Sequence, residues 1–165
     1  KKEWAPATAP IYAILEGLAI GGLSALLEAR YKGIVLQAVA LTFATLVTML
    51  VAYRTGLIKV TDKFRTAIIA LTGAIALLYL VTMVLSLFKV SVPFVFGGGT
   101  FGIIFSLVVV VVAALNLALD FDFIEQAAGA GAPKYVEWYA AFGLMVTLVW
   151  LYLEMLRLLA KFRER

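Results

Sequence analysis

The chain has 165 residues, of which 64% are hydrophobic and 15% are charged, and its mean hydropathy is +1.05. A soluble domain is about half apolar and about a quarter charged, so this composition predicts an integral membrane protein. The sequence contains no cysteine and no histidine, which excludes disulfides, Ser-His-Asp catalysis and imidazole-bound metals, and its net charge of +4 forms no nucleic-acid footprint.

Five apolar runs are long enough to cross a hydrocarbon layer of about 30 Å, which takes about 20 helical residues. We predict helices at residues 11–27, 34–53, 66–88, 100–125 and 133–161. Proline and glycine separate the third and fourth runs, and the short turn AAGAGAPK makes the last two helices antiparallel neighbours. Because lipid cannot satisfy backbone hydrogen bonds, the predicted fold is an all-α membrane helix bundle, with residues 1–165 in a single transmembrane domain.

The two ends of the bundle carry equal numbers of basic residues. Seven lysines and arginines fall on each side of the membrane, so the positive-inside rule does not choose an orientation. The chain opens with KKEWAPATAP, which has neither an initiator methionine nor a signal-peptide pattern. We therefore expect it to continue a longer polypeptide.

Acidic residues within the apolar runs are the candidate functional groups, because an ionisable group in a spanning helix is costly and usually faces a pathway. The fourth run ends in LNLALDFDFIEQ, where Asp120, Asp122 and Glu125 have no basic neighbour. If this helix ends near residue 126, Asp120 lies level with Ala140, one turn from Glu137. Crowded carboxylates repel one another and favour protonation, so we predict that Asp120, Asp122 and Glu137 titrate together as a pH sensor.

A calcium ion bound at Asp120 and Asp122 is an alternative way to satisfy these acids, since calcium takes carboxylate and carbonyl oxygens in flexible geometry. Asn116 shares the face of Asp120, and Glu16 and Glu154 are further candidates for an ion pathway. A simpler interpretation is that Asp122 and Glu125 end the helix in the headgroup region. Spacing places Glu154 about 21 Å beyond Ala140, with Arg157 as its local partner.

Several segments together resemble the Bax inhibitor-1/YccA family, also called transmembrane Bax inhibitor motif proteins, and in particular its bacterial branch. They are ILEGLAIGG at 14–22, GIVLQAVALTFAT at 33–45, LALDFDFIEQAAGAGAPKY at 117–135 and the closing LYLEMLRLL. The resemblance implies a seven-helix bundle whose last helix is wrapped by the others, so that the five helices here are its third to seventh.

The resemblance also implies a calcium leak governed by two aspartates on the last two helices, in the bacterial inner membrane. Glu16 and Asp120 match acidic positions of the family pattern. The second aspartate matches Glu154 by motif, but spacing from Asp120 places it near Met145, so Glu137 is the local substitute.

We therefore predict a pH-sensitive cation leak, with calcium as the ion, gated by carboxylates at the end of the fourth helix. The lipid bilayer and calcium are the expected partners, no resident cofactor is expected, and the chain is not predicted to be an enzyme. The alternative is a non-transporting membrane subunit that modulates a protease or stress complex and docks through small-residue stripes and the basic tail KFRER. An intramembrane aspartyl enzyme is the least favoured hypothesis.

Overall fold

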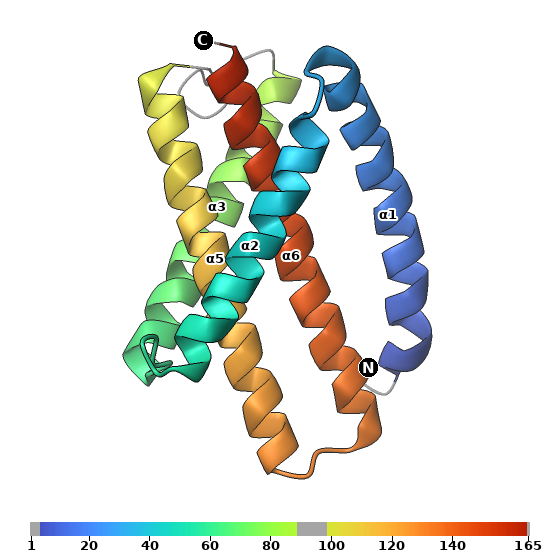
Figure 1. Cartoon of the computed structure of the whole chain (residues 1–165), viewed down its shortest axis with the longest axis vertical. Helices are drawn as coiled ribbons and strands as arrows, with labels where there is room; N and C mark the ends of the chain where they lie inside the picture. The colour runs from blue at the N-terminus through green and yellow to red at the C-terminus, as the bar shows by residue number, and fades with distance from the viewer. Residues whose placement is uncertain (1–3, 89–98, 165) are drawn as a thin grey trace.

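The computed structural model describes residues 4–88 and 99–164, and within them the chain forms five long helices and no strand (Figure 1). All five are long and apolar enough to cross a membrane. The predicted all-α membrane bundle is therefore confirmed. The helices are α1 (Ala5–Arg30), α2 (Ile34–Arg54), α3 (Asp62–Leu87), α5 (Thr100–Gly129) and α6 (Lys134–Arg163).

Two helix boundaries differ from the prediction in ways that affect the candidate site. Helix α1 begins at Ala5 rather than at residue 11, with Pro6 in its first turn, where the missing N–H of proline costs nothing. Helix α5 continues to Gly129 rather than ending at residue 125, because its last turn is rich in alanine, a strong helix former. The chain reverses only at Gly131, whose positive φ of 61° suits glycine.

Helices α5 and α6 form the centre of the bundle as an antiparallel pair (Figure 1). Helix α2 packs against both, α1 packs against α6 and α2, and α3 packs against α5. Ala113 and Leu117 of α5 and Leu151 of α6 are fully buried at the core of this arrangement. The last helix is thus covered by α1, α2 and α5, whereas α3 reaches it through side chains.

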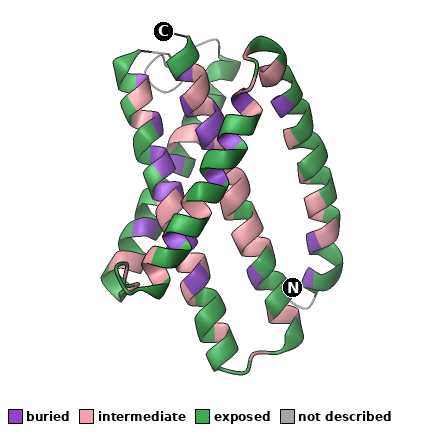
Figure 2. Ribbon diagram, in the orientation of Figure 1, coloured by how far each residue is buried: buried purple, intermediate pink, exposed green. Residues whose placement is uncertain are grey.

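The outer faces of the helices carry exposed apolar side chains, as expected where lipid is the solvent (Figure 2). Helix α1 is the most exposed of the five along its apolar length. It runs in the same direction as α6, because Tyr12 stacks edge-on against Phe142 with ring centroids 5.0 Å apart, and Ser24 hydrogen-bonds Tyr152 at 2.7 Å. These two contacts hold α1 alongside α6.

Candidate functional site

Asp120 lies on α5 where this helix meets α6. An ideal Cβ at Gly143 of α6 would lie 3.8 Å from its Oδ1 atom, and Thr147 is near enough to hydrogen-bond its carboxylate. The Oδ2 atom is buried and has no hydrogen-bond partner among the residues that the structure describes. Burying a carboxylate oxygen without a partner is costly, so this position needs a proton, a water molecule or a cation to complete it.

The depth of Asp120 differs from the sequence prediction. It lies level with Gly143, one turn deeper along α6 than Ala140, because α5 continues to Gly129 while α6 begins at Lys134, close to the predicted start. Glu137 therefore lies closer to the hairpin turn than to Asp120, and its side chain is exposed.

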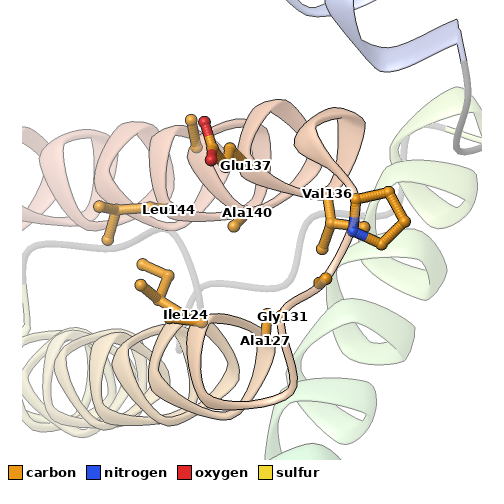
Figure 3. A pocket seen from close by; sticks show the side chains of 11 residues that line it. Ile124, Ala127, Gly131, Val136, Glu137, Ala140 and Leu144 are labelled. Atoms are coloured by element: carbon orange, nitrogen blue, oxygen red, sulfur yellow. The ribbon is translucent and has the colours of Figure 1, made fainter.

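A cavity of about 510 Å³ separates the ends of α5 and α6 next to the hairpin turn. Figure 3 shows Ile124 and Ala127 of α5 facing Ala140 and Leu144 of α6 across it, with Glu137 on the α6 side. The cavity is lined mainly by small and apolar side chains, and Glu137 is its ionisable group. Glu137 is thus placed beside this opening.

The other two acids at the end of α5 have partners on other helices. Asp122 forms a salt bridge with Arg65 of α3 and accepts a hydrogen bond from Gln126 at 2.7 Å. Glu125 accepts a hydrogen bond from the hydroxyl of Tyr53 on α2. Two residues apart on a helix, Asp120 and Asp122 point to different faces, so Asp122 turns toward α3 while Asp120 turns toward α6.

The predicted calcium site at Asp120 and Asp122 has no third acidic ligand. Within residues 4–88 and 99–164, no group of three or more acidic side chains gathers where a metal ion could sit. Calcium normally takes six to eight oxygen ligands, so two carboxylates on different faces of one helix would supply few of them.

Asn116 and Glu16 are both half-buried, on different helices. The Asn116 amide donates to Thr72 of α3 at 2.8 Å and to the carbonyl of Val112 at 2.9 Å. Glu16 interacts with Tyr12, one turn earlier on α1. Asn116 therefore adds a polar contact between α3 and α5, one turn from Asp120.

Glu154 is the most deeply buried acid of the described chain, with 1% of its surface exposed. Its Oε1 atom accepts hydrogen bonds from Tyr79 of α3 at 2.9 Å and from Arg157 at 2.8 Å, which confirms the predicted local pairing with Arg157. Its Oε2 atom has no hydrogen-bond partner among the described residues. At 1.5 Å per residue, Glu154 lies about 16 Å along α6 from Gly143, so it belongs to a separate cluster from Asp120.

Several partners of these acids were not predicted, among them Tyr53 on α2 and Arg65 and Tyr79 on α3. Arg65 and Tyr79 lie on α3, and no local pattern links them to acids on α5 and α6. Lys161 is also buried, near Glu154 and Arg157. Glu154, Arg157 and Lys161 follow one another at intervals of three and four residues, so they share one stripe of α6, and that stripe was the available signal for Lys161 in the sequence.

Loss of the salt bridge between α3 and α5 is expected to have a small effect. Arg65→Gln should lower the free energy of unfolding by about 1 kcal/mol and the unfolding midpoint by about 2 to 4 °C, because the Arg65 side chain is 41% exposed. Thermal unfolding in detergent measures this. Lys63→Gln, at an exposed position on the same helix, is the matched control and should leave the midpoint unchanged. Equal shifts in the two variants would contradict a stabilising role for the bridge.

A family model described as Bax inhibitor 1 like matches residues 1–164, which includes all five helices. No curated protein and no solved structure matches the chain.

Proposed function

Because the chain belongs to the Bax inhibitor 1-like family, whose members are non-enzymatic membrane proteins, we propose that it is a pH-sensitive calcium leak of the bacterial inner membrane. The buried, unpartnered Oδ2 atom of Asp120 carries this proposal. An acid inside a membrane bundle usually faces a pathway, and one that lacks a fixed partner is able to exchange a proton or a cation.

Protonation of Asp120 is the proposed switch. At low pH the carboxyl group is neutral and the contact between α5 and α6 is closed. As the pH rises, the charge that appears on Asp120 attracts a cation and weakens the dry contact with Gly143 and Thr147. Gly143 presents no side chain to the carboxylate, so α6 packs closely against Asp120 at this level.

The other acids are assigned supporting roles in the same pathway. Glu137, beside the hairpin cavity, would raise the local concentration of cations at that end. Asp122 would act through its salt bridge with Arg65, which joins α3 to α5 next to Asp120. Asn116 and Glu16 are polar positions that would line the same pathway. Calcium is the proposed transported ion.

Calcium flux into liposomes tests the proposal. Purified protein is reconstituted with a calcium-sensitive dye inside the vesicles, and flux is measured across a series of pH values. We expect the flux of the unmodified protein to change with pH and that of Asp120→Asn to lose this dependence, because the amide cannot titrate. Glu125→Gln, an exposed acid five residues further along α5, serves as the matched control and should behave like the unmodified protein.

Two outcomes would count against the proposal. An unchanged pH response in Asp120→Asn would remove Asp120 from gating. A complete lack of flux, together with a stoichiometric membrane partner that copurifies, would support the alternative of a non-transporting modulator.

A further inference from the structure

A cavity of about 420 Å³, which we call the window, lies between α1, α2 and α6. Its walls include Ile20 of α1, Phe43 of α2 and Met145 of α6, each in the interior of its helix and far from either end. Gly143 faces Asp120 whereas Met145 lines the window, and residues two apart on a helix point to different faces. The window is therefore separate from the candidate ion site.

Two contacts between α1 and α6 frame the window. Tyr12 stacks on Phe142 at one end and Ser24 hydrogen-bonds Tyr152 at the other, and these two positions of α6 are about 15 Å apart along its axis. Helices α1 and α2 meet at the turn that joins them and diverge away from it (Figure 1). The opening is thus bounded by a fixed contact on each side.

The polar groups in the wall of the window already have partners. The Thr42 hydroxyl donates to the carbonyl of Ala38 at 2.8 Å, and the Tyr152 hydroxyl is hydrogen-bonded to Ser24 at 2.7 Å. Among the residues that the structure describes, no acidic or basic side chain lines the window. A buried water molecule needs polar partners, so these walls suit an apolar occupant.

The window is continuous with the surface that faces lipid. Val39 and Phe43 of α2 lie in its wall and are also 36% and 59% exposed, so the apolar outer face of α2 leads directly into it. A lipid chain at this depth reaches the window without crossing a polar surface. The cavity is only about as large as one turn of an α-helix with its side chains, which is too small for a spanning helix of a second copy.

We propose that the window binds one acyl chain of a membrane phospholipid, which completes the packing of α1 against α2 and α6. Side chains around a cavity lose dispersion contacts unless an apolar group fills it, so the bound chain stabilises the bundle. Because the walls make only apolar contacts, the site recognises the chain and not the headgroup. The proposal does not depend on calcium transport.

Bromine atoms on an acyl chain quench tryptophan fluorescence on contact, which tests the site in a bilayer. The three native tryptophans are replaced with phenylalanine, and one reporter at a time is introduced: Met145→Trp in the window, Leu18→Trp on the outer face of α1, or Phe121→Trp in the core. Leu18 is 72% exposed and Phe121 is buried, so these two reporters give the limits for full and absent lipid contact. Each variant is reconstituted in dioleoyl phosphatidylcholine or in the same lipid brominated at its double bonds.

We expect brominated lipid to quench Met145→Trp as strongly as Leu18→Trp and to leave Phe121→Trp bright. If Met145→Trp stayed as bright as Phe121→Trp, the proposal would be overturned, because side chains or a second copy would then close the window to lipid. Quenching of Met145→Trp by brominated phosphatidylcholine but not by brominated phosphatidylglycerol would also overturn it, since the headgroup and not the chain would be recognised.

Filling the window gives a second test that keeps the native tryptophans. Added dioleoyl phosphatidylcholine should raise the unfolding midpoint of the unmodified protein in detergent by about 4 °C or more, and that of Ile20→Trp by less than about half as much, because the indole ring occupies the window. Leu18→Trp, two residues earlier on the outer face of α1, is the matched control and should respond like the unmodified protein. Equal responses in the three proteins would contradict the proposal.

Discussion

Replacing Arg157 with methionine is expected to destabilise the bundle by about 3 to 5 kcal/mol, because it leaves the carboxylate of Glu154 buried without its ion-pair partner. Glu154 is 1% exposed, and its Oε2 atom already lacks a hydrogen-bond partner in the described chain. The loss should lower the unfolding midpoint by at least about 6 °C in detergent. Circular dichroism during a thermal ramp measures it.

The double variant Glu154→Leu with Arg157→Met is the control for this effect. Removing both charges leaves no buried carboxylate without an ion-pair partner, and replacing a buried ion pair with apolar side chains is often neutral, so the double variant should recover most of the lost stability. Glu154→Leu alone should cost less than Arg157→Met, because the Arg157 side chain is 32% exposed and its head can reach the headgroup region. If the double variant were no more stable than Arg157→Met, the instability of Arg157→Met would not come from the unpaired carboxylate of Glu154.

Replacing Asp120 with leucine is expected to stabilise the bundle by about 1 to 3 kcal/mol and to abolish the pH response of calcium flux. The stabilisation follows because the substitution removes a buried carboxylate oxygen that has no partner in the described chain. Thermal unfolding in detergent and liposome flux across pH measure the two effects on the same preparation.

Asp122→Leu is the matched control, two residues along the same helix. It removes the partner of Arg65, so it should lower the unfolding midpoint, whereas Asp120→Leu should raise it. Midpoint shifts of opposite sign in the two variants would distinguish Asp122, an acid that stabilises the fold, from Asp120, an acid that is kept for function. A similar loss of stability in both variants would mean that the Asp120 carboxylate is well satisfied in the folded protein.

The contrast between these acids bears on how the site is organised. Asp122, Glu125 and Glu154 each have a basic or hydroxyl partner on another helix, and together they tie α2, α3 and α6 to their neighbours. Asp120 faces a glycine and a threonine instead. A buried acid with one oxygen that has no partner in the described chain costs stability, and such a group is one that function is expected to retain.

The membrane class and the five helices could be predicted from the sequence because they depend on local properties. Runs of about 20 apolar residues leave a helix as the only way to satisfy the backbone in lipid, whatever the rest of the chain does. The pairing of Glu154 with Arg157 is equally local, since residues three apart on a helix face each other. Asp120 could be identified as a candidate functional residue for the same local reason, because it is an acid inside an apolar run.

The partners of the acids were decided only by the tertiary structure. Arg65 and Asp122 are separated by 57 positions, and whether they meet depends on how α3 packs against α5. The residue facing Asp120 depends on where α5 ends: one extra turn, to Gly129, moves the facing position from Ala140 to Gly143. A helical turn changes the register of an antiparallel pair by about 5.4 Å, which is enough to replace one neighbour with another. Composition and periodicity determine that helices form, whereas the register between them depends on turn position and packing, which no single segment encodes.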